Sequence, residues 1–475
     1  MLLKHSFFYL FARGLPGIIN LLAMAIYTRL LSPDDYGRYA LMIAGVGLAN
    51  VTLFQWLRLG MLRFLPVYEK RQKVFLSTIV AGYIVLVVVS GLGGVITLVF
   101  TSDSVLRGLV ILGIILLWVQ AFFEINLELV RIQLAPGRYG LISIVKATVA
   151  LGIGGLLAFL GFGAWGLIIG LMTGMLISIF IQAGSWNKIR FHFIETRIFR
   201  ELIVYGLPLS ATFVLGFVVS SSDRFLLGWF LGSGVTGMYA AGYDIANQTL
   251  GVLMVIVNLA AYPLAIRALE QNGKMAARQQ LSHNIILLMA IALPCTIGFV
   301  LLAPNIVSVF LGQAFRNTAV MLIPWVALGS LLAGIKAYYF DLSFQLGRHT
   351  IGQVWVALAA AIVNVVLNFW WIPCFGIMGA AYATAVAYAI SLGLSWFLGK
   401  RIFPLPFPVR EAFKVVLAVT GMACVLWPLR VFHGVGALLT QGMCGLLAYG
   451  LMILGLNVAD VRMKALNLMR GDEKA

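Results

Sequence analysis

Charged residues are scarce in this sequence, and their scarcity argues against a soluble fold. Only 10% of the 475 residues are Asp, Glu, Lys or Arg, whereas 62% are hydrophobic. Soluble domains carry about 25% charged residues, and a large share of any folded surface must face water. A large soluble all-α protein is therefore a poor alternative, and lipid is the natural solvent for such a chain.

Cysteine is scarce, and the usual catalytic signatures are missing. The four cysteines (Cys295, Cys374, Cys424 and Cys444) lie in or beside apolar stretches without a CxxC pair, so we interpret them as small core residues. The five histidines are not clustered, and no HExxH, GxSxG or P-loop motif occurs. We therefore expect no enzyme activity, no metal site and no cofactor beyond a coupling ion.

Long apolar runs are what the sequence has in abundance. A helix needs about 20 mostly apolar residues to cross a bilayer core. The chain therefore predicts an all-α integral membrane protein with about 14 transmembrane helices. The predicted spans are 8–30, 37–65, 74–100, 105–133, 139–160, 164–185, 200–231, 237–266, 280–302, 319–345, 350–371, 376–399, 411–430 and 436–457. The segment 303–318 reads instead as a re-entrant or interfacial piece.

Basic residues set the expected orientation. Most of the 33 Lys and Arg residues fall near the termini or in loops after even-numbered spans. The positive-inside rule then places both termini in the cytoplasm. The net charge of +17 is explained by basic loops that face an anionic leaflet, so no nucleic-acid partner is expected.

Two distant stretches share a pattern, TRLLSPDDYGRYALM at 28–42 and GWFLGSGVTGMYAAG at 228–242. Three further matches occur in the same order in both halves. They are GLP at 14–16 and 206–208, Gly-Arg at 137–138 and 347–348, and FGAWG at 162–166 with FGIMG at 375–379. Together they predict that spans 1–6 and 7–12 are two copies of one unit. Because six is even, both copies enter the membrane in the same sense, as a parallel repeat.

The repeat predicts the domain organisation. Helices 1–6 form an N-lobe at 1–190, helices 7–12 form a C-lobe at 191–400, and 401–475 holds helices 13 and 14 with a cytoplasmic tail. In transporters built from repeats, the substrate site lies between the repeats, and one rocks against the other. The alternative for the repeated corner alone is a tight turn that needs Pro33 and Gly37 for backbone reasons.

The corner IYTRLLSPDDYGRYAL at 26–41 and the stretch SSSDRFLLGWFLGSGVTGMYAAGYDIAN at 220–247 carry a family resemblance. With two six-helix halves and two extra helices, the chain resembles the Wzx-like polysaccharide transporters of the multidrug/oligosaccharidyl-lipid/polysaccharide (MOP) exporter superfamily. The resemblance implies a monomeric flippase for polyprenyl-diphosphate-linked oligosaccharides, such as O-antigen or exopolysaccharide units, in a bacterial inner membrane. It also implies coupling to Na⁺ or H⁺, and a polysaccharide polymerase and chain-length regulator as partners.

Charged side chains inside the predicted spans are candidates for the site, because such charges are costly in a membrane. A lipid diphosphate is an anion and needs positive counter-charge to cross hydrocarbon. Arginine suits phosphate because its donors form a fork. We therefore expect the diphosphate to contact Arg13, Arg58, Lys146 and Lys336.

Other residues in the spans receive secondary roles. Glu124, Glu128 and Asp341 are candidates for ion coupling, and Pro16 and Pro208 for bending helices as the lobes rock. The sugars would contact polar and aromatic walls, with Asn20, Gln55, Trp118, Gln120, Asn126, Tyr338 and Tyr339 as candidates. Asp223 and Arg224 are expected to form an architectural pair.

Three alternatives stay open at this stage. The intramembrane charges could pair with one another for structure alone, with Glu124 or Glu128 neutralising Arg58, Arg131 or Lys146. A MATE-like cation or drug exporter would favour acidic residues in its cavity. A membrane enzyme that polymerises or ligates polysaccharide would need a large outer loop with catalytic groups, and the predicted outer loops are short.

Overall fold

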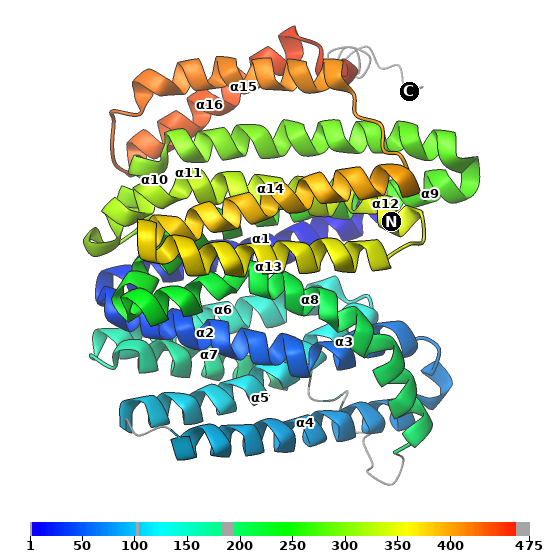
Figure 1. Cartoon of the computed structure of the whole chain (residues 1–475), viewed down its shortest axis with the longest axis vertical. Helices are drawn as coiled ribbons and strands as arrows, with labels where there is room; N and C mark the ends of the chain where they lie inside the picture. Colours follow the sequence, from blue (N-terminus) through cyan, green and yellow to red (C-terminus); the bar gives the residue numbers. More distant parts are fainter. Residues whose placement is uncertain (1, 101–103, 183, 185, 187–193, 462–475) are drawn as a thin grey trace. The chain divides into compact units, whose positions relative to one another are not determined.

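The computed structural model describes residues 2–100, 104–182, 184, 186 and 194–461, with side chains from Gly14 onward except at 104–106. All regular structure in these ranges is helical, and no strand occurs there (Figure 1). Apolar runs become helices because a backbone in lipid must form its hydrogen bonds within its own segment. The prediction of an all-α fold is confirmed.

The chain divides into two compact units, residues 1–240 and 241–475. The first unit contains α1 (Leu2–Leu30), α2 (Pro33–Leu53), α3 (Gln55–Phe64), α4 (Gln72–Phe100), α5 (Ser104–Ile132), α6 (Pro136–Phe159), α7 (Gly163–Phe180), α8 (Thr196–Leu231) and the start of α9 (Ser233–Leu301). A 3₁₀ turn at Glu69–Arg71 precedes α4. The lobe boundaries near residues 190 and 400 remain predictions.

The second unit contains the rest of α9 and the last seven α-helices. These are α10 (Ala303–Phe310), α11 (Gln313–Ile335), α12 (Leu342–Leu346), α13 (Ile351–Phe375), α14 (Ile377–Ile402), α15 (Val409–Leu429) and α16 (Val435–Gly455). A π-helical turn, Lys336–Phe340, joins α11 to α12, and a 3₁₀ turn covers Val458–Asp460. The segment 303–318 forms α10 and the start of α11, and the eight-residue α10 is too short to cross a bilayer.

Among the described residues, eleven or twelve candidate spans are found, and a count near the predicted fourteen follows if α1 and the two arms of α9 are each counted as spans. Eleven helices are long and apolar enough to cross a membrane. The pair α2 and α3, bent by 48°, makes one more broken span, and the apolar part of α1, Gly14–Leu30, adds another. The last comes from α9, whose 69 residues would measure about 100 Å as a single rod.

A glycine divides α9 into two arms. Gly273 has φ 80° and ψ −174°, outside the helical region, and glycine reaches such angles without steric cost. The two arms pack against each other, because the Asn284 side chain donates to the Ala261 carbonyl at 2.9 Å. Leu250 from one arm and Leu281 from the other are buried in the same core cluster.

The repeated corners contact each other within the first unit. A Cβ built on Gly37 of α2 would overlap the Ser233 carbonyl, and one on Gly237 of α9 would overlap the Pro33 carbonyl. Asp34 also accepts a hydrogen bond from the Ser233 hydroxyl. Gly37 lies inside a helix, so helix-to-helix approach, rather than a tight turn, requires it.

Outward-facing apolar side chains complete the picture of a membrane protein. On α4, Val88 is 55% exposed and Val95 is 58% exposed; on α16, Leu446 is 75% exposed. Soluble monomers rarely leave apolar faces of this kind uncovered, whereas lipid solvates them. The chain is therefore a multi-pass membrane protein, in agreement with its composition.

Candidate functional site

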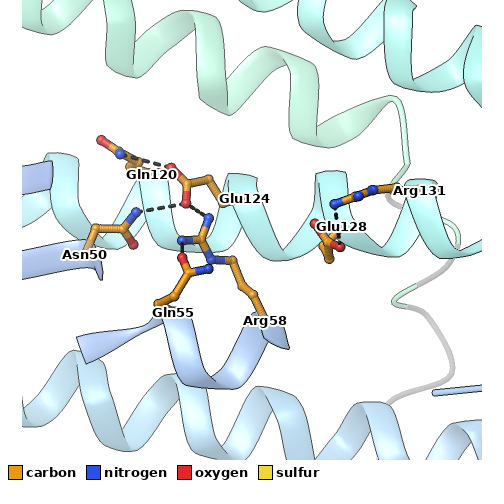
Figure 2. Close-up of polar contacts among 7 residues, drawn as sticks. All are labelled: Asn50, Gln55, Arg58, Gln120, Glu124, Glu128 and Arg131. Atoms are coloured by element: carbon orange, nitrogen blue, oxygen red, sulfur yellow. Dashed lines mark hydrogen bonds and ion pairs between the residues drawn. The ribbon is translucent and has the colours of Figure 1, made fainter. Parts of the chain in front are cut away.

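A cluster of five polar side chains lies inside the helix bundle of the first unit. Arg58 of α3 forms an ion pair with Glu124 of α5, and it also donates to Gln55 at the start of α3. The Asn50 side chain of α2 donates to Glu124 Oε2 at 2.8 Å, and Gln120 donates to Oε1 at 3.0 Å. Figure 2 shows the cluster, with Glu124 between the Asn50, Arg58 and Gln120 side chains.

The bend between α2 and α3 positions this cluster. Asn50 lies in the last turn of α2, Arg58 lies in α3, and the buried Phe54 caps both helices at the break. A straight helix would carry Arg58 further along the axis of α2. On α5, Gln120 and Glu124 are four residues apart and therefore share a face.

Two polar atoms of the cluster remain without partners among the described residues. They are Nε of Arg58 and Oδ1 of Asn50, both shielded from solvent. The Arg58 side chain is 18% exposed and that of Glu124 is 23% exposed. Buried donors and acceptors are normally satisfied, so the spare N–H of Arg58 is a donor that a ligand could use.

The next carboxylate along α5 pairs separately. Glu128 lies 3.3 Å from Arg131 on the same helix, and the Arg131 side chain is 48% exposed. The alternative that these carboxylates pair with nearby cations therefore holds for two pairs: Glu124 with Arg58, and Glu128 with Arg131. Neither carboxylate forms an ion pair with Lys146 in the part of the chain that the structure describes.

Lys146 of α6 is a cation without an ion pair among the described side chains. Its Nζ lies 5.3 Å from the centre of the Phe123 ring, which is a cation–π distance. Close packing holds its backbone, because a Cβ on Gly174 of α7 would contact the Lys146 carbonyl. A partly buried ammonium with only a ring beside it can accept an anionic ligand without first losing a carboxylate.

The second unit holds a different charge pair at the π-helical turn. Lys336 Nζ donates to Asp341 Oδ2 at 2.7 Å, and the turn is closed by the Asp341 amide donating to the Lys336 carbonyl. Ser395 of α14 donates to Oδ1 at 2.7 Å, and Gln353 of α13 donates to Oδ2 at 3.3 Å. The Asp341 side chain is 2% exposed and that of Lys336 is 15% exposed, so the carboxylate is buried. Single π turns inside helices are frequent at functional sites.

The remaining predicted contacts are dispersed. Asn20 is exposed on α1, and Arg13 of the same helix lies outside the residues whose side chains are described. Trp118 donates to the Ser90 hydroxyl at 2.9 Å. Asn126 is fully buried and accepts from the Trp186 indole at 2.8 Å.

The two tyrosines of the π-helical turn differ in burial. Tyr339 is 1% exposed and donates to the Pro406 carbonyl, so it belongs to the core of the second unit. Tyr338 is half-buried beside the same core cluster.

The residues with predicted mechanical roles lie in helices. Pro16 lies inside α1 and Pro208 inside α8. Asp223 is fully buried, accepts from the Arg224 amide at 2.8 Å and also accepts from the Tyr239 hydroxyl. Asp223 thereby ties the end of α8 to the start of α9, next to the repeated corner.

Sequence reasoning did not single out three members of these two clusters. Asn50, Gln353 and Ser395 are polar residues in apolar runs, and each bonds to a carboxylate that was singled out. A buried amide or hydroxyl in an otherwise apolar helix is the signal that could have found them. Ser and Thr, however, also satisfy themselves on their own helix backbone, so this signal alone does not choose among them.

Outside the spans, a polar contact fixes the end of α3 to α8. The Tyr68 hydroxyl donates to Glu201 at 2.7 Å, and Arg71 pairs with Glu195. This hydrogen bond to the Glu201 carboxylate, with smaller help from burial, raises the pKa of Tyr68. These contacts attach the segment after the C-terminal end of α3, the helix that carries Arg58, to the start of α8.

Comparison with known proteins places this arrangement in a family. Residues 26–320 match the sequence family described as polysaccharide biosynthesis protein. The chain belongs to this family. Membership confirms the resemblance to Wzx-like transporters, whose motifs at 26–41 and 220–247 lie within the matched range.

Members and relatives of the polysaccharide biosynthesis family share sequence along much of the chain. A proposed O-antigen transporter of Shigella flexneri is 21% identical over 413 residues, which cover 83% of this chain and 97% of the relative. A proposed low-salt glycan biosynthesis flippase of Haloferax volcanii, Agl15, is 23% identical over 328 residues, which cover 67% of each chain.

Two solved structures share the fold. The lipid II flippase MurJ in an inward closed conformation has a TM-score of 0.78 and 16% identity, over 94% of this chain and 98% of MurJ. An inward-facing MATE transporter of the MOP superfamily has a TM-score of 0.65 and 15% identity, over 83% and 97%. The chain therefore shares its fold with these two transporters.

Proposed function

We propose that this protein is a flippase that moves polyprenyl-diphosphate-linked oligosaccharides from the inner to the outer leaflet of a bacterial inner membrane. Family membership and similarity to a proposed O-antigen transporter and a proposed glycan flippase support this substrate class. The fold shared with the MurJ structure supports alternating access as the mechanism. In alternating access the substrate crosses by a conformational change of the protein, and no covalent bond is made or broken.

The observation that carries the proposal is positive charge held inside the helix bundle of the first unit. Arg58 keeps a spare donor, and Lys146 has no ion pair among the described residues. An anionic headgroup can leave water only where counter-charge is already in place. We assign the diphosphate to Arg58 and Lys146, with Arg13 and Lys336 as further cations along its path.

The other expected roles extend this proposal. Na⁺ or H⁺ would drive transport through Glu124, Glu128 or Asp341, and Pro16 and Pro208 would let their helices bend. The sugars would contact Asn20, Gln55, Trp118, Gln120, Asn126, Tyr338 and Tyr339. We further propose a monomer with both ends in the cytoplasm, which works beside a polysaccharide polymerase and a chain-length regulator.

A MATE-like cation exporter is the second candidate, because a MATE structure shares the fold. Such an exporter would need a carboxylate that is free to receive a cationic substrate. Glu124, Glu128 and Asp341 each already pair with an arginine or lysine. The pairing favours an anionic substrate over a cationic one.

Transport of a lipid-linked oligosaccharide by purified protein in vesicles tests the proposal. Arg58→Ala should reduce the transport rate by on the order of a hundredfold, because truncating one partner of a partly buried charge pair costs about 2–5 kcal/mol. Arg58→Lys should restore part of the rate, since the charge returns without the forked donors. Arg131→Ala, which removes an exposed arginine on α5, is the matched control and should transport normally.

Two results would count against the proposal. Normal transport by Arg58→Ala would show that this charge is structural and that the phosphate assignment is wrong. Efflux of an organic cation by the wild type, with no movement of the lipid-linked oligosaccharide, would favour the MATE-like alternative.

A further inference from the structure

The Glu124 carboxylate occupies a site built like a binding site for a free anion. It receives hydrogen bonds from three side chains on three helices: Asn50 of α2, Arg58 of α3 and Gln120 of α5. Convergent donors of this kind, with an arginine among them, are what proteins use to hold a carboxylate or a phosphate. In Figure 2 the three donors surround the Glu124 head group, which is tethered by its own chain.

The site also has unused capacity. Arg58 gives one terminal nitrogen to Glu124 and the other to Gln55, while its Nε has no partner among the described residues. A carboxylate has two oxygens, whereas the diphosphate that joins a lipid to a sugar carries non-bridging oxygens on both of its phosphorus atoms. A phosphate in place of Glu124 could therefore use the Arg58 donor that the carboxylate leaves unused.

We propose that Glu124 is a built-in occupant of the anion site, and that a phosphate group of the substrate displaces it. This inference rests on the proposed function and deepens it, because it says what the site holds between transport cycles. In the empty protein Glu124 neutralises Arg58. In the loaded protein the phosphate takes Arg58 and Asn50, and Glu124 turns away.

Energetics favour such an arrangement in a transporter. A lone arginine inside an apolar bundle would be strongly disfavoured, so an internal carboxylate stabilises the empty protein. The same carboxylate competes with the substrate and lowers its affinity, which assists release on the far side. A tethered competitor acts at high effective concentration, so the competition does not depend on ions in solution.

Displacement would also change how the helices are joined. Glu124 and Arg58 belong to α5 and α3, and they are 66 residues apart in sequence. Breaking this pair removes a charged link between the two helices, while Leu57 of α3 and Ile125 of α5 remain in one core cluster. Binding of phosphate is thus coupled to the packing of the helix that carries Arg58.

The neighbouring carboxylate provides a matched control. Glu128 lies one turn further along α5 and pairs with the exposed Arg131 rather than with Arg58. Glu124→Gln and Glu128→Gln remove the same charge from the same helix. Only the first removes the occupant of the anion site.

Binding of inorganic pyrophosphate and of farnesyl diphosphate to purified full-length protein in lipid nanodiscs tests the inference by calorimetry. Glu124→Gln should bind both probes roughly tenfold more tightly, because a neutral amide competes less well for arginine than a carboxylate does. Glu128→Gln removes a charge near Arg58 that does not occupy the anion site, so it should tighten binding less than Glu124→Gln does, and Arg58→Ala should lose binding. In transport, Glu124→Gln should lower KM and also lower kcat, since release becomes slower.

The outcomes separate this inference from the proposed function. If Arg58→Ala loses binding while Glu124→Gln binds no more tightly than the wild type, the displacement idea is wrong and the phosphate assignment stands. If Arg58→Ala binds both probes normally, both ideas fail. Should Glu124→Gln not fold, Glu124→Asp serves instead: the shorter side chain should bind the probes more tightly than wild type, and equal or weaker binding overturns the inference.

Discussion

The two units each hold a partly buried ion pair, and the pairs are built on different plans. In the first unit, Arg58 and Glu124 are 66 residues apart and join two helices. In the second, Lys336 and Asp341 are five residues apart and close a single π-helical turn. A pair between helices can separate when the helices shift, whereas a pair within one turn moves as a single piece.

Solvent access sharpens the contrast. The Glu124 side chain is 23% exposed, and its partner Arg58 has a donor to spare. Asp341 is 2% exposed, and its oxygens accept from Lys336, Gln353 and Ser395. The carboxylate of the first ion pair can therefore be replaced by another anion, whereas the carboxylate of the second is buried and bonded on both oxygens. We infer that the first pair separates when substrate binds and that the second, whatever its part in transport, also maintains the local structure.

The largest expected effect on stability comes from Lys336 and Asp341, the pair with the buried carboxylate. Lys336→Met leaves the Asp341 carboxylate buried without its cation, and breaking a buried pair costs about 3–5 kcal/mol. Each carboxylate keeps two side-chain hydrogen bonds, but Arg58→Met should cost clearly less because Glu124 is 23% exposed and Asp341 only 2%. Thermal unfolding of the two variants in one detergent measures the difference in apparent stability.

A double variant separates folding from transport in that experiment. Lys336→Met with Asp341→Asn removes both charges and should recover most of the lost stability. If the double variant folds but does not transport, the pair also takes part in transport, through Lys336 or through Asp341. Equal stability losses for Lys336→Met and Arg58→Met would break the comparison between the two pairs.

A smaller effect comes from the hydrogen bonds around each carboxylate. Ser395→Ala removes a buried donor to Asp341 and should destabilise the protein by about 1–3 kcal/mol. Gln120→Ala removes a donor to the more exposed Glu124 and should cost less than about 1 kcal/mol. The reverse order in the denaturation curves would show that burial does not set the strength of these contacts.

Much of the fold could be predicted from the sequence, because the signal for a membrane helix is local. Long apolar runs and polar breaks are sufficient for fourteen spans, whatever their neighbours are. The bend at Phe54 and the π turn at Lys336–Phe340 could not be predicted, since each lies inside a single predicted span, 37–65 or 319–345. Their geometry depends on packing with other helices, which no local pattern records.

The charged residues of the candidate site could be predicted from the sequence, but which of them form ion pairs with one another could not. Predicted depth in the membrane identified Arg58, Lys146 and Glu124, because an ionised side chain inside a bilayer is costly and is usually kept for function. That Glu124 pairs with Arg58 rather than Lys146 depends on the bend between α2 and α3. The repeated corner was visible in sequence, but the reason for Gly37, its contact with the carbonyl of Ser233, required coordinates.

The smallest expected effect comes from a third charge pair that lies near the first. Arg131 and Glu128 lie three residues apart at the end of α5, and the Arg131 side chain is 48% exposed. Exposed pairs within a helix contribute about 0.3–0.5 kcal/mol, and a basic residue in the last turn adds a similar amount through the helix dipole. Arg131→Ala should therefore lower the apparent free energy of unfolding by less than about 1 kcal/mol. Transport should be unchanged, as neither residue joins two helices, and addition of salt should erase most of the difference from wild type. A loss as large as that of Lys336→Met would mean that solvent exposure does not rank these three pairs, and the distinction between the exchangeable carboxylate of Glu124 and the buried one of Asp341 would fail with it.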